Sequence, residues 1–305
     1  MGKYYRDYAD FLAERFDGKV QKLAINAGFT CPNRDGSKGT GGCIYCNNHS
    51  FNPSYSPTPL DIRQQIEHGR AFFRRKYRDM RYLAYFQAYT NTYNDISRLM
   101  PLYLEAVEDD DIVGLIIGTR PDCMPDALLK GLQDINRKKR VIIEYGVETS
   151  HNSTLQLINR CHSWEDATDA IARTSVAGLD IGIHLIMGLP GEDIPMMLQT
   201  IDRISSLPID TVKLHQLQIL RGTRMATGTY DIHTFTVDEY IDMCIAIIQR
   251  LPKHIAIERF VSSAPDNLLI SPRWGLKNYQ FTNLLHNRLA SLPEITNGHQ
   301  KDILL

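Results

Sequence analysis

Seven short runs rich in β-branched and aromatic residues recur along the chain and predict β-strands. Between these runs, apolar side chains recur at helical spacing, as at Ile62, Ile66 and Phe73. Strands that alternate with helical stretches predict βαβ units and a parallel sheet, either closed as a barrel or open and doubly wound. The predicted strands lie at 22–27, 82–89, 112–117, 141–147, 181–187, 212–219 and 255–260.

Polar residues and glycines gather where the predicted strands end. The first strand runs into a cysteine-rich loop, and later strands end at 87–92, 118–122, 146–150 and 188–192. In both barrel and doubly wound sheets, ligands bind at the carboxyl ends of the strands. We therefore expect the functional site at these loops.

Composition places the chain among ordinary globular proteins. It has 305 residues, of which 43% are hydrophobic and 23% charged. With 34 basic and 35 acidic residues, its net charge of −1 gives no global attraction to nucleic acid or to an acidic membrane. No segment has the apolar length of a membrane span, and the first residues carry no signal peptide, so we expect a cytoplasmic protein.

Three of the six cysteines crowd into one glycine-rich loop: Cys31, Cys43 and Cys46. In a cytoplasmic chain such a cluster indicates a metal site rather than disulfide bonds. Three thiolates can ligate three irons of a cubane cluster and leave one iron open, or they can bind zinc if His49 supplies a fourth ligand. The cysteines alone leave both interpretations open.

Several motifs at the other strand ends resemble the radical S-adenosylmethionine (SAM) superfamily. They are Cys43-Ile-Tyr-Cys46, Gly146-Val-Glu148, Asn159-Arg160 and the segment from His184 to Glu192. Further segments resemble the YhcC/YtqA-type group, which is related to the elongator catalytic subunit: Phe29-Thr-Cys31-Pro-Asn-Arg-Asp-Gly, Phe86-Gln-Ala-Tyr-Thr-Asn-Thr-Tyr93 and Gly118-Thr-Arg-Pro-Asp122. The long gap between Cys31 and Cys43 is usual in this group.

The resemblance implies an α/β fold, a partial (β/α)6-type TIM-like barrel of parallel strands with a C-terminal extension. We expect an N-terminal extension over 1–19, the core barrel over 20–262 and the C-terminal extension over 263–305. It also implies a 4Fe-4S cluster held by Cys31, Cys43 and Cys46, and an electron donor of the flavodoxin or ferredoxin type. On that reading the enzyme cleaves SAM reductively and forms a 5′-deoxyadenosyl radical.

The resemblance also assigns contacts with SAM. Glu148 takes the place of a residue that meets the ribose or the methionine end, and Arg160 that of the partner of the methionine carboxylate. His184 faces the adenosine, and Gly188 begins a turn that allows close approach to a ring. From the residues alone, Glu148 would be an inward carboxylate paired with an arginine such as Arg120, Arg160 a solvated arginine, and His184 a satisfied core histidine.

The second strand end departs from the superfamily. Many members carry a Gly-Gly-Glu type motif there for the methionine ammonium, whereas this chain has Gln87, Thr90 and Asn91. These three residues are the candidates for that contact.

The elongator-like kinship implies tRNA as the substrate, with modification of the wobble uridine side chain. Two basic runs bear on this, one from Arg70 to Arg81 and one from Arg137 to Arg140. Such runs are commonly solvated faces, and the first is the better tRNA candidate. The alternative function is a zinc-binding α/β interaction or nucleic-acid-binding module without radical chemistry.

Overall fold

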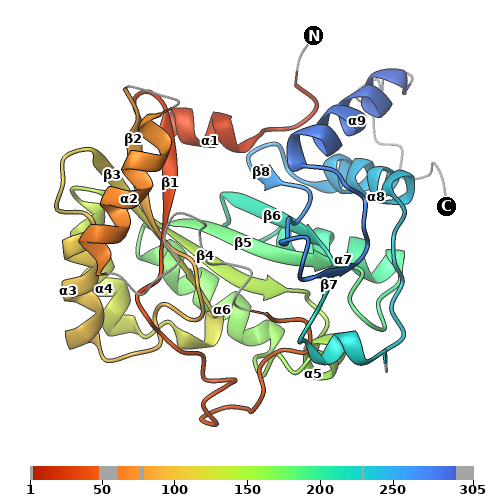
Figure 1. Cartoon of the computed structure of the whole chain (residues 1–305), viewed down its shortest axis with the longest axis horizontal. Helices are drawn as coiled ribbons and strands as arrows, with labels where there is room; N and C mark the ends of the chain where they lie inside the picture. Colours follow the sequence, from red (N-terminus) through yellow and green to blue (C-terminus); the bar gives the residue numbers. More distant parts are fainter. Residues whose placement is uncertain (1–2, 48–60, 76–78, 229, 293–305) are drawn as a thin grey trace.

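Seven parallel strands form one curved sheet, a half-barrel with helices on its outer side (Figure 1). The computed structural model describes residues 3–47, 61–75, 79–228 and 230–292. The sheet runs in the order β1-β2-β3-β4-β5-β6-β8, so each strand lies beside the next parallel strand in sequence. The strands are β1 (Val20–Ile25), β2 (Arg81–Phe86), β3 (Ile112–Thr119), β4 (Arg140–Glu148), β5 (Asp180–Met187), β6 (Thr211–Gln216) and β8 (Ala256–Arg259).

Helices connect these strands and cover the outer face of the sheet. Several begin at a side-chain cap: Asp61, Ser163, Asp193 and Thr236 each accept a hydrogen bond from the backbone amide three residues later. The helices are α1 (Tyr8–Arg15), α2 (Ile62–Arg74), α3 (Ile96–Ala106), α4 (Asp126–Asn136), α5 (Asn152–Leu157), α6 (Trp164–Val176), α7 (Ile194–Ile204), α8 (Val237–Arg250) and α9 (Asn278–Ser291).

The predicted parallel α/β half-barrel is confirmed, and each of the seven predicted runs overlaps a strand of the sheet. The run at 212–219 was wrong as a single strand. The chain leaves the sheet after Gln216, and the amide of Leu217 donates to the carbonyl of Met187. A second short strand, β7 (Ile219–Leu220), then pairs antiparallel with β9 (Leu269–Ser271).

Helix α1 closes the amino-terminal end of the barrel. Phe11 is fully buried and belongs to one apolar cluster with inward residues of β2, β3 and β4, among them Leu83, Ile116 and Ile142. Arg15 also forms ion pairs with Asp180 at 3.3 Å and with Asp210 at 2.9 Å, at the amino-terminal ends of β5 and β6. The barrel is therefore filled from below and stays open at the carboxyl ends of its strands.

The segment after β8 packs on α8 through aromatic rings. Tyr240 of α8 contacts Trp274 and Phe281, and the rings of Trp274 and Phe281 are stacked with centroids 6.0 Å apart. The domain boundaries at 19/20 and 262/263 stay predictions. Across the described residues, no helix has the length and apolar character needed to cross a membrane.

Candidate active site

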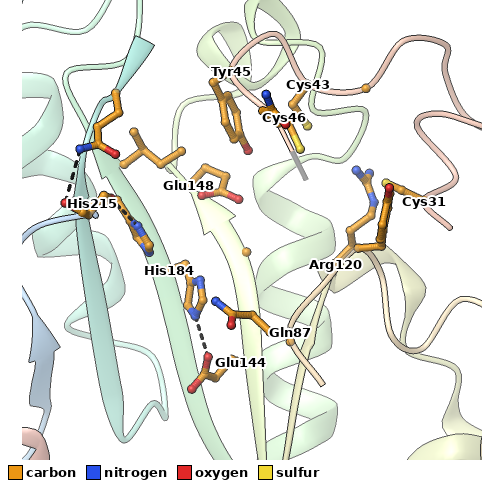
Figure 2. Close-up of a pocket in the computed structure, with 18 of the residues that line it drawn as sticks. Cys31, Cys43, Tyr45, Cys46, Gln87, Arg120, Glu144, Glu148, His184 and His215 are labelled. Carbon is orange, nitrogen blue, oxygen red and sulfur yellow. Dashed lines mark hydrogen bonds and ion pairs between the residues drawn. The ribbon is translucent and has the colours of Figure 1, made fainter. Parts of the chain in front are cut away.

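A cavity of about 230 Å³ opens at the carboxyl ends of the strands. Its walls come from the loop after β1 and from the ends of β2 to β6 and β8, so residues from most of the sheet converge on it (Figure 2). The predicted site residues among its lining are Cys31, Cys43, Cys46, Gln87, Thr90, Glu148, Arg160 and His184.

The cysteine loop is fixed by contacts of Ile44, which lies between the last two cysteines, and of Asn33, which lies earlier in the loop. Ile44 is 1% exposed and packs in an apolar cluster with residues of α5 and of the loops after β5 and β6. Its amide donates to the carbonyl of Ile158, and its carbonyl accepts from Met225. Earlier in the loop, the buried Asn33 donates to the carbonyl of Asn159. The loop is therefore tied to the segment that carries Arg160.

The donor set suits an iron–sulfur cluster. All three thiols are free, and Cys43 Sγ lies 3.5 Å from Asn33 Nδ2 and 3.7 Å from an Arg160 guanidinium nitrogen. N–H donors and a positive charge near sulfur stabilise the thiolate that binds metal. Burial, together with Cys43, raises the pKa of Cys46 to about 11, so metal binding there would release a proton.

The three thiols are spread around the cavity. Figure 2 shows Cys43 and Cys46 together and Cys31 farther across, beside Arg120. Among the described residues, no three His, Cys, Asp or Glu side chains are placed to hold a single metal ion. A cubane cluster takes each thiolate on a different iron, so its ligands need not converge on one point. His49, the fourth zinc ligand of the other interpretation, lies outside the described residues.

Two arginines beside the cysteines have hydrogen-bonding capacity to spare. Arg120 makes a bidentate pair with Asp122 at 2.9 and 3.0 Å, yet its Nη1 is buried and has no partner in the described part of the chain. Arg160 donates to the carbonyl of Gly146 at 2.6 Å and lies 3.3 Å from Glu148, and its buried Nε also lacks a partner there. Buried donors without partners are costly, and at a cavity wall they indicate a ligand.

These contacts correct two interpretations drawn from the residues alone. Glu148 pairs with Arg160 rather than with Arg120, which is engaged by Asp122. Arg160 is 7% exposed and so is not a solvated arginine. Although burial alone would raise it, the Arg120 guanidinium lowers the pKa of Asp122 to about 2, which keeps this carboxylate charged.

The backbone around the cavity adopts left-handed conformations at residues other than glycine. Tyr89 has a φ of 65° and Glu148 a φ of 69°, and both line the cavity. Asn159 at 54° and Cys161 at 58° flank Arg160. Such conformations cost about 1–3 kcal/mol each and concentrate at functional sites. Here they orient Glu148 and Arg160 toward the same space.

His184 is held in one tautomer by Glu144. Its Nε2 lies 2.9 Å from a Glu144 carboxylate oxygen, and burial together with the charge of Lys213 lowers the pKa of His184. The neutral ring therefore donates through Nε2, because an ionised carboxylate can only accept. Its Nδ1 is left as an acceptor on the side chain that lines the cavity.

Below His184 lies a group of buried charges, here called the barrel floor: Lys22, Tyr85, Glu144, Lys213 and Glu258. Glu144 is 2% exposed and accepts from Lys22 at 2.7 Å, Tyr85 at 2.7 Å and Lys213 at 2.9 Å. Glu258 pairs with both lysines at 2.9 Å. Burial opposes ionisation of Glu144, but Lys213 and Lys22 hold its pKa well below the usual range.

Sequence reasoning missed this floor as a unit. Its five residues lie far apart in the sequence, on β1, β2, β4, β6 and β8. The signal in the sequence was the presence of charged residues within otherwise apolar strands. Because charged side chains are buried only when they are paired, such residues are expected to pair with one another.

Two of the predicted cofactor residues do not line the cavity. Asn91 is fully buried and donates to the carbonyls of Phe86 at 3.1 Å and Gly118 at 2.7 Å, so it ties the ends of β2 and β3 together. Gly188 has a φ of 90°, and a Cβ there would lie 3.1 Å from the ring of Phe235. It therefore turns the chain behind the cavity wall.

Part of the basic run on α2 is engaged in ion pairs within the protein. Arg70 is 6% exposed and pairs with Glu67 at 2.5 Å and Asp109 at 2.7 Å. Lys76 and Arg78 of the same run lie outside the described residues. In the second run, Arg140 pairs with Asp180 at 2.8 Å.

Family profiles match most of the chain. The profile of the Radical SAM superfamily matches residues 30–204, and that of the Radical_SAM C-terminal domain matches 209–291. The chain belongs to the radical SAM superfamily and is an enzyme of that class, in its YhcC/YtqA-type family. The family implies SAM and a 4Fe-4S cluster as cofactors.

Two relatives cover nearly the whole chain. YtqA of Bacillus subtilis (strain 168) is 31% identical over 95% of this chain and 90% of its own length. YhcC of Escherichia coli (strain K12) is 38% identical over 86% of this chain and 85% of its own length.

More distant matches share the fold or part of the chain. The structure of Elp3 from Methanocaldococcus infernus superposes with a TM-score of 0.66 at 19% identity, over 90% of this chain and 63% of that one. A tRNA uridine(34) acetyltransferase of Methanocaldococcus jannaschii is 25% identical over 57% of this chain, and the match spans only 32% of that protein.

Proposed function

We propose that this enzyme binds a 4Fe-4S cluster through Cys31, Cys43 and Cys46 and cleaves SAM reductively at it. The observation that carries the proposal is that three free thiols line one cavity together with two arginines, each of which has a buried donor that no described residue accepts from. When bound and reduced, by a donor of the flavodoxin or ferredoxin type, the cluster supplies the electron that splits SAM into methionine and a 5′-deoxyadenosyl radical.

The residues of this chain bind and orient SAM. Arg160, whose Nε has no partner among the described residues, takes the methionine carboxylate, and the neighbouring Arg120 offers its Nη1 to the same anion. Glu148 lies against Arg160 and accepts from the ribose hydroxyls or the methionine end. This arrangement fixes the methionine end beside the cysteines.

The adenosine lies toward β5 in this proposal, where His184 offers Nδ1 as an acceptor for an amino or hydroxyl hydrogen. Gln87 and Thr90 line the cavity near the end of β2, and their side-chain oxygens are acceptors for the methionine ammonium. Asn91 and Gly188 support these contacts by shaping the strand ends.

The substrate of the radical is, in this proposal, tRNA, and the reaction modifies the side chain of the wobble uridine. Support comes from the sequence similarity to a tRNA uridine(34) acetyltransferase. The similar region covers 57% of this chain. The Elp3 structure shares the barrel.

The test of SAM cleavage is anaerobic reconstitution with iron and sulfide, followed by dithionite and SAM, with 5′-deoxyadenosine quantified. We expect 5′-deoxyadenosine from the wild type and none from Cys43→Ala, with Cys244→Ala as a matched control because Cys244 is buried away from the cavity. A colourless protein with one zinc per chain and no cleavage would refute the proposal.

The tRNA assignment is tested separately by mass spectrometry of nucleosides from tRNA of a strain lacking the gene. Loss of one modified wobble uridine, restored by the wild-type gene and not by the Cys43→Ala gene, is the expected result. An unchanged nucleoside profile would refute tRNA as the substrate but would not affect the proposal that the enzyme cleaves SAM.

A further inference from the structure

Outside the cysteine loop, one arginine on the cavity wall has no carboxylate partner among the described residues. Four arginines line the cavity. Arg120 and Arg160 pair with Asp122 and Glu148, and Arg34 donates to the carbonyl of Cys46 within the cysteine loop. The fourth, Arg259 at the end of β8, forms no ion pair with any described residue.

The barrel floor does not supply the missing counter-charge. It holds two lysines and two glutamates, and each lysine contacts both carboxylates, so its formal charges cancel. Arg259 follows Glu258 in sequence, and the pairing of β6 with β8 shifts register there, so both side chains face the barrel interior; Glu258 is engaged by Lys22 and Lys213 and forms no ion pair with Arg259. The wall near Arg259 therefore keeps a net positive charge.

Arg259 is held in place by a neutral histidine. Its Nη2 donates to His215 Nδ1 at 3.1 Å, and Ser262 Oγ lies 2.8 Å from the same nitrogen. Burial, followed by the charge of Arg259, keeps the pKa of His215 well below its usual value. Because arginine can only donate, Nδ1 is the acceptor and Nε2 carries the proton.

This arrangement leaves donors in excess. The Nε of Arg259 and the Nε2 of His215 are both buried and without partners among the described residues, and both side chains line the cavity. A cation flanked by spare N–H donors binds an anion, and a guanidinium suits the two oxygens of a carboxylate or phosphate.

The position of this group separates it from the proposed contacts with the methionine end of SAM. Figure 2 shows His215 across the cavity from Cys31 and Arg120. An anion at Arg259 would therefore lie across the cavity from the proposed methionine contacts, on the side of His184, whose ring centroid is 5.4 Å from that of His215.

We propose that Arg259 forms a subsite for an anionic group of the substrate, a carboxylate or a phosphate. That the ligand is the substrate rests on the proposed function, whereas binding of the anion itself requires no SAM cleavage. The enzyme would then select substrates that carry this group at a fixed distance from the reacting carbon.

Equilibrium dialysis of the reconstituted protein against radiolabelled acetate and, separately, inorganic phosphate tests the subsite. The ionic strength is held constant with chloride. We expect the wild type to bind at least one of the two anions, and the dissociation constant to rise about tenfold or more in Arg259→Gln. Arg259→Lys keeps the charge but not the fork, so its affinity should fall between the two.

The matched control is Arg250→Gln on α8, which removes an arginine that does not line the cavity and should bind like the wild type. Thermal melting of each variant confirms that it is folded. The anion that binds more tightly identifies the chemistry, carboxylate or phosphate.

Equal binding by wild type and Arg259→Gln, or no binding of either anion by the wild type, would overturn the subsite. The outcome is independent of the SAM assay. If Arg259-dependent anion binding persists while no 5′-deoxyadenosine forms, the proposed function fails and the anion subsite stands.

Discussion

The two ends of the cavity differ in whether their buried polar groups have hydrogen-bond partners. At the barrel floor, Glu144 of β4 accepts from side chains of β1, β2, β5 and β6, and both lysines have carboxylate partners. At the cysteine end, Arg120 and Arg160 are also buried but keep donors that no described residue satisfies. Where every buried polar group has a partner within the protein, the hydrogen-bond network stabilises the fold. Where buried donors lack partners, we expect a bound ligand to accept from them.

Backbone conformation follows the same division. The floor residues lie within regular strands, while Glu148, Asn159 and Cys161 at the cysteine end have positive φ values. Strained conformations persist where the surrounding structure enforces them and function benefits. The comparison predicts that changes at the floor reduce stability and that changes at the cysteine end reduce ligand binding.

The largest expected effect is loss of the cluster on removing one cysteine. Cys31→Ala should bind little iron after reconstitution, because the cluster loses one of its three protein ligands. Iron and sulfide analysis gives the measurement, and Cys244→Ala should keep the wild-type content. Wild-type iron content in Cys31→Ala would contradict the assignment of the ligands.

At the floor, Glu144→Gln should lower the free energy of unfolding by about 3–5 kcal/mol, because it leaves two lysines with one buried carboxylate. Urea denaturation measures the change. As a control, Asp169→Asn breaks an exposed pair with Arg173 and should cost less than about 1 kcal/mol. Similar losses in the two variants would mean that the floor is not a stabilising network.

At the cysteine end, Arg160→Lys should weaken SAM binding by about 10- to 100-fold with little change in unfolding free energy. A lysine keeps the charge but cannot bond the Gly146 carbonyl, Glu148 and a carboxylate together. Equilibrium binding of SAM to the reconstituted protein measures this. A large loss of stability with unchanged affinity would place Arg160 with the floor residues instead.

The smallest effect is the acid dependence of the floor. The pKa of Glu144 is depressed in the folded state, so its stabilisation is fully present above the unfolded value of about 4.5 and is lost as pH falls through the folded value. The difference in unfolding free energy between wild type and Glu144→Gln should be constant from about pH 7 to 5 and shrink below about 4.5. A difference that already declines near pH 6 would show that the lysines do not hold Glu144 ionised.

The strand–helix alternation was predictable because apolar periodicity and turn residues are local signals, whereas the half-barrel was expected only from the resemblance to the radical SAM superfamily. Strand ends were less so: the run at 82–89 stops at Phe86, and Tyr89 takes a left-handed conformation that no local pattern indicated. The pairing of Lys22 with Glu144 joins residues 122 positions apart and depends on how the sheet curls. Arg259 gave no signal, since a missing partner is visible only in the fold.

The most direct test of the central claim is electron paramagnetic resonance of the reconstituted, dithionite-reduced protein with and without SAM. Binding of SAM to an open iron at Cys31, Cys43 and Cys46 predicts the signal of a reduced 4Fe-4S cluster that changes when SAM is added, and a weaker change in Arg160→Lys at the same SAM concentration. A cluster signal that is insensitive to SAM, or a protein that holds zinc and gives no signal, would contradict it.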